Sequence, residues 1–155
     1  NAIINTYFAD VGKLITNIEY QNKERLLCVY NDSINNIVEG KDNVLVTFEN
    51  TKITFASVEL KNKMLTIEEK DTGEFVNITN IINNKVKKYE TEEIAKEVYT
   101  SENVIALNLG TELHIINTNG WLLKKYISSQ EINEVVISDK VVGIIYRDKI
   151  EIIDI

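Results

Sequence analysis

The fold is decided by Val141-Val142-Gly143-Ile144-Ile145-Tyr146-Arg147-Asp148-Lys149-Ile150-Glu151-Ile152-Ile153, which is an apolar run, a polar turn and a second apolar run. The same unit recurs from Leu26 to Ile37. There Tyr30-Asn31-Asp32-Ser33-Ile34 matches Tyr146-Arg147-Asp148-Lys149-Ile150 at the Tyr, the Asp and the Ile. Two apolar runs around a short polar turn are typical of a β-hairpin. The sequence therefore predicts the same hairpin at least twice.

Two further copies extend this repeat. One runs through Leu109-Gly110-Thr111-Glu112-Leu113, and a looser one through Phe48-Glu49-Asn50-Thr51-Lys52-Ile53. Positions 109 and 146 are 37 residues apart, which is close to the length of one blade of a β-propeller. Repeats of this kind build a scaffold whose core is shared between neighbours, and such scaffolds host unrelated functions.

Short runs of β-branched and aromatic residues, bounded by Asn, Asp, Gly and Lys, fill the chain and indicate strands. The predicted strands are Ile3 to Phe8, Leu14 to Tyr20, Arg25 to Tyr30, Ile34 to Glu39, Asn43 to Glu49, Ile53 to Leu60, Met64 to Glu69, Phe75 to Ile82, Val86 to Tyr89, Ala95 to Tyr99, Val104 to Leu109, Leu113 to Asn117, Trp121 to Ile127, Val135 to Ile137, Val141 to Tyr146 and Ile150 to Ile155. This pattern fits an all-β sandwich, barrel or propeller. The repeated hairpin favours a propeller-like fold of about three to four blades.

Three segments carry turn or helix signals. Asn119-Gly120 predicts a tight hairpin turn, because both residues tolerate positive φ. Asp71-Thr72-Gly73 predicts a second, solvated turn. Thr91 to Lys96 has acidic residues where a helix could begin, so one short helical turn is an option there.

The length of 155 residues suits one domain, since such a chain buries roughly 70% of its unfolded surface. We expect residues 1–155 to form a single propeller-like domain or the C-terminal part of a larger propeller. The opening Asn1-Ala2 matches what remains of a Ser-Asn-Ala cloning scar when its first residue is lost. On that interpretation the sequence is excised from a longer protein, and an export signal or anchor would lie outside it.

The last strand, Ile150 to Ile155, predicts an open sheet edge that can pair with another chain. Either Ile3 to Phe8 returns to close the last blade, or another part of the parent protein does so, or two copies pair. The expected partners are therefore a protein or a second copy bound through this edge. The net charge of −7 and the pI near 4.8 argue against nucleic acid, because an acidic surface repels phosphate.

The sequence offers few residues for catalysis. His114 is the only histidine, and the alternation of Leu113, His114 and Ile115 points it away from its apolar neighbours, toward a groove or solvent. The single cysteine, Cys28, lies in an apolar run and is interpreted as a small buried core residue. No nucleotide-binding loop or metal-ligand spacing is present, so we expect no cofactor, no metal and no catalytic residue.

The weak candidates for ligand binding are Trp121, Tyr126 and His114. Trp121 and Tyr126, with Tyr99 and Tyr89, could form an aromatic shelf for sugars, although strand aromatics more often pack in the core. The acidic stretch through Glu68 and Glu69, the cluster of Glu90, Glu92 and Glu93, and Ser128-Ser129 near Glu131 are interpreted as charged loops and turns. Gly110 and Gly143 are interpreted as strand or turn glycines.

One resemblance goes beyond the fold. The stretch Asn103-Val104-Ile105-Ala106-Leu107-Asn108-Leu109-Gly110-Thr111-Glu112-Leu113-His114, continuing through Gly120-Trp121-Leu122 to Gly143-Ile144-Ile145-Tyr146-Arg147-Asp148-Lys149-Ile150, resembles the C-terminal part of an uncharacterised bacterial family catalogued as a domain of unknown function. The likeness is best from Glu97 to Ile155 and around Leu26 to Ile34, and weak between Asn50 and Tyr89. No Trp-Asp dipeptide closes a blade.

The resemblance implies a WD40-like or quinoprotein-like propeller, tethered outside the cell membrane by an N-terminal anchor, with no established activity. The leading hypothesis is a non-enzymatic interaction or scaffold module. The first alternative is a cell-wall or polysaccharide-binding module, which an exposed Trp121 in a groove would favour. The second is an acidic-site hydrolase, which needs paired carboxylates in one cleft with raised pKa values.

Overall fold

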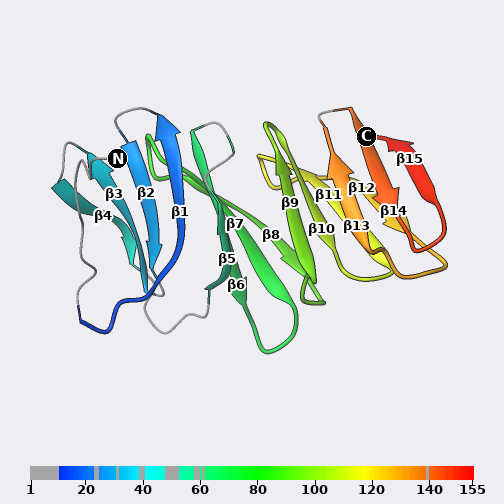
Figure 1. Cartoon of the computed structure of the whole chain (residues 1–155), viewed down its shortest axis with the longest axis horizontal. Helices are drawn as coiled ribbons and strands as arrows, with labels where there is room; N and C mark the ends of the chain where they lie inside the picture. The colour runs from blue at the N-terminus through cyan, green and yellow to red at the C-terminus, as the bar shows by residue number, and fades with distance from the viewer. Residues whose placement is uncertain are drawn as a thin grey trace, which may run out of the picture.

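The computed structural model describes residues 11–22, 25–30, 32–38, 41–47, 53–57, 60, 62–138 and 140–155. Over these residues the chain forms fifteen β-strands and no helix (Figure 1). All neighbouring strands are antiparallel and fall into four sheets. The prediction of an all-β, propeller-like fold of about three to four blades is confirmed. The described residues contain no helix that is long and apolar enough to cross a membrane.

The four sheets are called blades A to D in chain order. Blade A contains β1 (Ile15–Asn22), β2 (Arg25–Tyr30), β3 (Ser33–Val38) and β4 (Lys41–Thr47), and blade B contains β5 (Ile53–Ser57), β6 (Lys63–Glu69), β7 (Glu74–Asn80) and β8 (Val86–Thr91). Blade C contains β9 (Glu97–Ser101), β10 (Val104–Asn108), β11 (Glu112–Asn117) and β12 (Leu122–Ile127), and blade D contains β13 (Glu134–Ile137), β14 (Val141–Ile145) and β15 (Ile150–Asp154). The first predicted strand, Ile3 to Phe8, lies outside the described residues.

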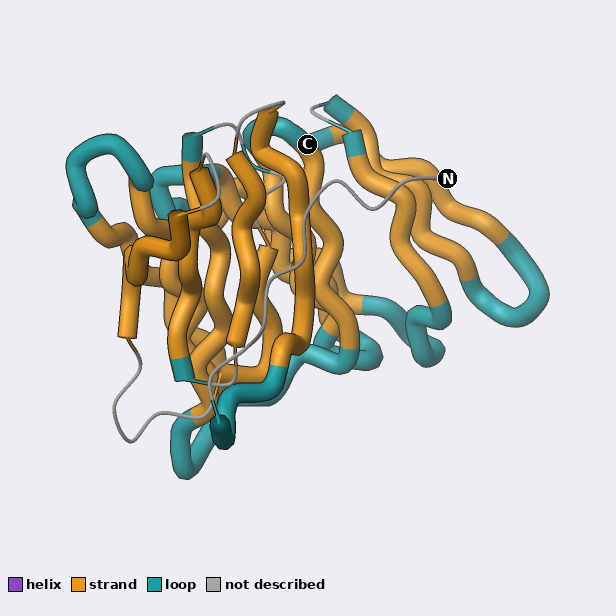
Figure 2. Tube along the Cα trace, turned by 60° about the vertical axis from the view of Figure 1, so that its left-hand side comes forward, coloured by secondary structure: helices purple, strands orange, loops and turns teal. Residues whose placement is uncertain are grey.

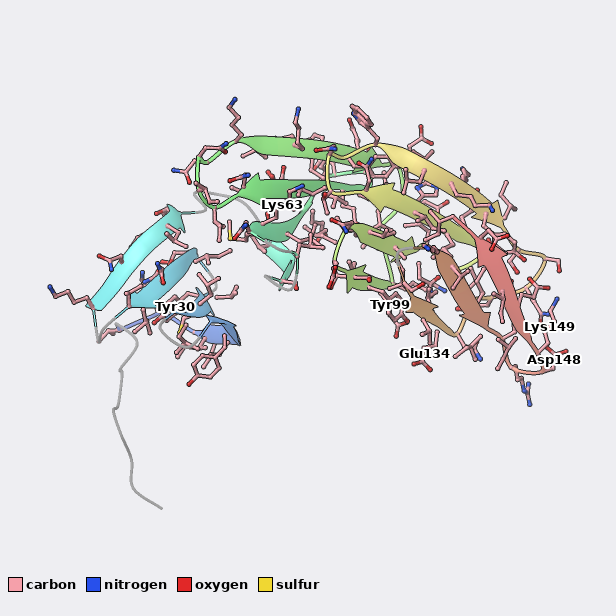
Figure 3. The ribbon with its side chains drawn as sticks, turned by 90° about the horizontal axis from the view of Figure 1, so that it is seen from above. Tyr30, Lys63, Tyr99, Glu134, Asp148 and Lys149 are labelled. Atoms are coloured by element: carbon pink, nitrogen blue, oxygen red, sulfur yellow. The ribbon has the colours of Figure 1, made fainter. Side chains whose placement is uncertain are left out.

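Seen from above, the blades follow an open arc with blade A at one end and blade D at the other (Figure 3). The first strand of each blade lies on the inner side of the arc and the last strand on the outer side. Turns gather at the two ends of the strands (Figure 2). This radial arrangement of three four-stranded sheets and one three-stranded sheet is that of propeller blades.

Apolar side chains fill the space between blades rather than a single central core. The cluster between blades B and C contains Leu60, Leu65, Ile67, Val76, Ile78, Ile105, Leu107, Leu109 and Ile116. The cluster between blades C and D contains Val104, Ala106, Leu113, Ile115, Ile132, Val135, Val142, Ile144 and Tyr146. Fully burying one large apolar side chain contributes about 1.5–3 kcal/mol, so these shared faces hold adjacent blades together.

Because side chains alternate along each strand, a blade has apolar side chains on both of its faces. In β6, Leu65 and Ile67 belong to the cluster shared with blade C. Met64 points the other way and packs with Leu27 and Ile34 of blade A. Successive side chains of a strand point to opposite faces, so an inner blade must be apolar on both. This explains why the first four residues of β10 (Val104–Asn108) are all apolar and why every residue of the strand is buried.

The repeated sequence unit is the turn between the second and third strands of a blade. Its first N–H donates to the carbonyl three residues on, as from Leu109 to Glu112 (2.8 Å) and from Tyr146 to Lys149 (2.9 Å). Tyr30 precedes the same turn in blade A. The predicted equivalence of these three copies is therefore confirmed.

The fourth predicted copy falls elsewhere. Residues 48–52 lie outside the described residues, and Ile53 begins β5, the first strand of blade B. The corresponding turn of blade B is the one predicted at Asp71-Thr72-Gly73, where Lys70 N–H donates to Gly73 O at 3.1 Å. The turn predicted at Asn119-Gly120 is also present between β11 and β12, with a φ of 77° at Gly120.

The helical turn considered at Thr91 to Lys96 does not form. Thr91 pairs with Glu74 as the last residue of β8, and its hydroxyl donates to the carbonyl of Glu93 at 2.7 Å. The start of the segment is therefore part of the sheet and cannot begin a helix. The few remaining residues before β9 are too short a run to nucleate a helix.

Gly73 is required by its surroundings. Its φ is 75°, and a Cβ atom built there would lie 1.9 Å from the carbonyl oxygen of Thr91. Both the left-handed backbone and the contact with β8 exclude a side chain. The glycine therefore fixes how the β6–β7 turn seats against the last strand of blade B.

We expect Gly73→Ala to lower the free energy of unfolding by more than about 1 kcal/mol, because it adds a backbone clash to the strain of a positive φ. Gly12→Ala is the matched control, since Gly12 has a φ of 88° but no atom within 4 Å of its built Cβ. Urea denaturation of both variants measures the difference. An equal loss in the two variants would show that the contact with Thr91 costs nothing.

Candidate functional site

The inner ends of blades C and D form a cleft. One part has a volume of about 470 Å³ and is lined by Glu97, Val98, Tyr99, Asn133 and Glu134. A second part of about 320 Å³ shares Glu97 and Asn133 and continues past Lys96, Asn108, Glu131 and Ile132. The two parts adjoin along β9 and the segment that leads into β13, are both open to solvent, and are together called the cleft. Tyr99 and Glu134 lie near each other on this inner side (Figure 3).

Backbone and amide hydrogen bonds hold the segment leading into β13 in place. Ile132 N–H donates to Gly110 O at 2.8 Å, and Asn133 N–H donates to Ile145 O at 2.9 Å. The buried Asn108 donates its Nδ2 to Ile132 O at 3.1 Å. The floor of the cleft is thus tied both to the β10–β11 turn of blade C and to β14 of blade D.

The walls of the cleft are acidic. Lys96 pairs with Glu131 and lowers the pKa of that carboxyl, while Glu97 accepts a hydrogen bond from the Tyr99 hydroxyl. Burial and this hydrogen bond raise the pKa of Tyr99 to about 12. The cleft therefore presents more carboxylates than cations, beside an aromatic ring, and suits a positively charged or hydrogen-bond-donating ligand.

His114 lies between blades B and C, and the expected position in a groove or solvent is wrong. Only 8% of the residue is exposed. Its Nδ1 lies 3.0 Å from the hydroxyl of Tyr89 in β8, and its Nε2 lies 3.3 Å from Glu112. It sits on the same face as Leu107, its cross-strand partner, because that face turns toward blade B. Alternation placed His114 correctly relative to its neighbours, but both faces of β11 are buried.

The hydrogen bonds fix the tautomer that neutral His114 adopts. A carboxylate can only accept, so Nε2 carries the proton toward Glu112 and Nδ1 accepts from the Tyr89 hydroxyl. Burial lowers the pKa of His114, although Glu112 acts in the opposite direction. Lys125 lies 2.6 Å from Glu112 and lowers the pKa of that carboxyl. Neutral His114 is therefore a hydrogen-bonded link between two blades.

Because the pKa of His114 is lower in the folded than in the unfolded chain, its contribution to stability is complete above pH 6.5 and is lost as the pH falls below that value. The loss for one group is at most about 1.4 kcal/mol per pH unit. We expect His114→Gln to remove this dependence between pH 7 and 5.5, measured by urea denaturation against the unchanged protein. Identical pH slopes in the two proteins would contradict the assigned link.

Tyr126 and Trp121 lie away from the cleft. Tyr126 belongs to the outer strand of blade C, where its hydroxyl lies 3.1 Å from that of Tyr146 and donates to Glu151. Glu151 has its pKa lowered to about 2, first by Lys149 and then by Tyr126. Tyr126 thus links blades C and D at their outer edge. Trp121 is exposed in the turn before β12 and lines neither part of the cleft.

The aromatic shelf considered from the sequence is not assembled. Tyr89 packs edge-on against His114 with the ring centroids 6.0 Å apart, so it faces the space between blades B and C. Tyr99 in β9 and Tyr126 in β12 belong to opposite edges of blade C. The structure therefore does not bring together the rings of Trp121, Tyr126, Tyr99 and Tyr89.

Most other candidates occupy structural positions. Cys28 is buried in blade A. Glu68 accepts from the Asn77 amide at 3.2 Å, and Glu90 pairs with Lys70. Ser128 accepts from Gln130 N–H in the connection after β12. The residues that the structure describes contain no group of three or more His, Cys, Asp or Glu able to hold a metal ion.

The cleft was missed at the sequence level, although Glu131 had been noted. Its walls are residues 97–99 and 131–134, which are separated by the rest of blade C. A usable signal was present: Glu97 and Glu134 each begin the first strand of a blade. First strands line the inner side of a propeller, so their polar residues meet there.

Comparisons with known proteins support the fold. No family model matches the chain, and no curated protein matches it. A chain of the Saccharomyces cerevisiae complex of Dbp5 with Nup159, Gle1, IP6 and ADP is 9% identical, with a TM-score of 0.63 over 90% of this chain and 44% of that one. A Bacteroides caccae protein of unknown function is 13% identical, with a TM-score of 0.57 over 95% and 62%. The WD40 domain of Neurospora crassa Pan2 is 10% identical, with a TM-score of 0.53 over 90% and 48%.

These likenesses define the class of the protein. The described residues form consecutive blades of a β-propeller, and the chain spans about half to under two thirds of the length of these solved structures. Identities this low show the fold alone.

Proposed function

We propose that the chain is a non-enzymatic interaction module and that the cleft between blades C and D binds a positively charged segment of a protein partner. The observation that carries this proposal is the cleft itself, whose two parts are lined by three carboxylates, Glu97, Glu131 and Glu134, and by one lysine, Lys96. The net charge of −7 favours encounter with a cationic partner. The ring of Tyr99 offers a surface for a lysine or arginine side chain.

The proposal also concerns where in the cell the module lies. The resemblance to a bacterial family catalogued as a domain of unknown function supports an exported protein that is tethered to the cell membrane by an N-terminal anchor. Protease treatment of intact cells that carry the full-length protein tests this location. Digestion of the propeller in intact cells is the expected result, and protection until lysis would contradict it.

The two alternatives are supported less well. Exposed Trp121 is the feature expected of a polysaccharide-binding module, but the other aromatic rings are directed elsewhere. A hydrolase needs a carboxyl with a raised pKa in the cleft, whereas Lys96 lowers the pKa of Glu131 there. Burial raises the pKa of Glu74, but that residue is buried at the start of β7 rather than in the cleft.

We expect a short lysine-rich peptide to shift the backbone amide resonances of residues 97–99 and 133–134 when it is titrated into the labelled protein. Glu97→Gln combined with Glu134→Gln removes two carboxylates from the cleft and should weaken binding at least tenfold, since each lost charge contact is worth about 1 kcal/mol or more. Glu102→Gln combined with Glu92→Gln is the control with the same charge change at exposed positions outside the cleft.

The two double variants separate specific from general attraction. Equal weakening in both would show that the peptide responds only to net charge. Resonance shifts spread over the outer strands, with none in the cleft, would also refute this site.

A further inference from the structure

The outer side of blades B and C carries a basic surface in an otherwise acidic chain. Residues 81–89 and 117–127 contain no Asp or Glu, although the whole chain has 24 acidic residues and a net charge of −7. The lysines in these two segments are Lys85, Lys87, Lys88, Lys124 and Lys125. We call the exposed surface of the two segments the basic rim.

The two segments touch each other in the fold. The first is the β7–β8 turn with the start of β8, and the second is the β11–β12 turn with β12. A Cβ atom built on Gly120 would lie 2.9 Å from the carbonyl oxygen of Lys88, so the β11–β12 turn lies directly against β8. Both strands are the last of their blades and follow the outer side of the arc (Figure 3). The basic rim is therefore one continuous surface across two blades.

Large apolar side chains are exposed within the same rim. Trp121 is 68% exposed and Ile82 is 76% exposed, and both lie in turns. Val86, Leu122 and Leu123 are each close to half exposed. Exposed apolar side chains that gather among polar ones mark an interaction surface. The rim therefore combines apolar groups with positive charge.

The same hydrogen-bonding device holds both turns in place. Asn80 and Asn117 are the last residues of the third strands of blades B and C. The Asn80 side-chain oxygen accepts from Ile82 N–H at 2.9 Å, and that of Asn117 accepts from Trp121 N–H at 3.1 Å. The exposure of these two apolar side chains is thus fixed by ordered turns, so a partner meets them already in place.

Three of the five lysines keep their charge available to a partner. Within the described part of the chain, Lys85, Lys87 and Lys88 form no ion pair. Lys125 pairs with Glu112, and Lys124 donates to the carbonyl oxygen of Asp154. The available positive charge therefore lies on β8 and the turn before it, next to Trp121.

We infer that the basic rim binds the surface of an anionic lipid bilayer. The lysines would contact lipid phosphates while their apolar stems lie along the interface. Trp121 and Ile82 would enter the headgroup region, where a Trp ring is favoured. Apolar side chains at the tips of turns enter a fluid interface without needing a complementary pocket, and this mode of binding needs no membrane-spanning segment.

This orientation leaves the cleft open. The cleft lies at the inner ends of blades C and D, whereas the basic rim lies on the outer side of blades B and C (Figure 3). The carboxylates of Glu97 and Glu134 would thus be directed away from an anionic surface that repels them. The inference is independent of the ligand proposed for the cleft.

The fluorescence of Trp121 tests the inference directly, because it is the only Trp in the chain. We expect phosphatidylcholine vesicles that contain phosphatidylglycerol to shift its emission to shorter wavelength and to sediment the protein at low salt. Vesicles of phosphatidylcholine alone should do neither. High salt should release the protein, since it screens charges at the surface.

Lys85→Gln combined with Lys87→Gln should weaken co-sedimentation at least tenfold, because each lysine near an anionic surface contributes to binding. Replacing the same two lysines by Arg should preserve binding. Lys41→Gln combined with Arg147→Gln is the matched control, since it makes the same charge change at exposed positions of blades A and D. Circular dichroism checks that each variant is folded.

A second pair of variants tests the apolar contribution. Trp121→Ser should weaken co-sedimentation at least fivefold, whereas Ile152→Ser, at a position that is 75% exposed in blade D, should leave it unchanged. Absence of binding to the anionic vesicles overturns the inference, and so does equal binding to neutral ones. Equal weakening by the rim and control variants also contradicts it. Co-sedimentation without a shift in Trp121 emission would refute insertion and indicate a site for soluble polyanions or acidic proteins.

Discussion

Face-to-face packing of apolar sheets is the interaction on which the rest of this structure depends. Each blade is a set of consecutive hairpins that has little core of its own, and its buried side chains are completed by the adjacent blade. Blade C illustrates this, since Leu107 packs toward blade B while Ala106 packs toward blade D. An isolated antiparallel sheet is marginally stable, so stability in this chain arises between blades.

The polar groups follow from the same constraint. A hydroxyl, imidazole or carboxyl that lies between two buried faces must find a partner there. His114 joins Tyr89 of blade B, and Tyr126 joins Tyr146 of blade D. Such contacts align one blade on the next. At the inner ends of blades C and D, Glu97 and Glu134 line the cleft.

Much of the fold could be predicted from the sequence because strands and tight turns are local. The hairpin from Val141 to Ile153 and the turn at Gly120 are predictable from their apolar runs and turn residues. The burial of His114 could not be predicted, because alternation identifies the face of the sheet on which a side chain lies but not what packs against that face. The cleft was also missed, since it forms where Tyr99 and Glu134 meet across two blades. Its acidic character follows from residues that looked like ordinary strand ends.

The most direct test of the account is a set of nuclear Overhauser contacts between side chains of adjacent blades. The structure predicts contacts from Met64 to Leu27, from Leu65 to Ile105, and from Ile115 to Val142, one pair for each junction between blades. Observing all three would establish the face-to-face stacking on which the arc and the cleft depend. Their absence, with contacts confined to strands within a blade, would show that the sheets do not stack in this order.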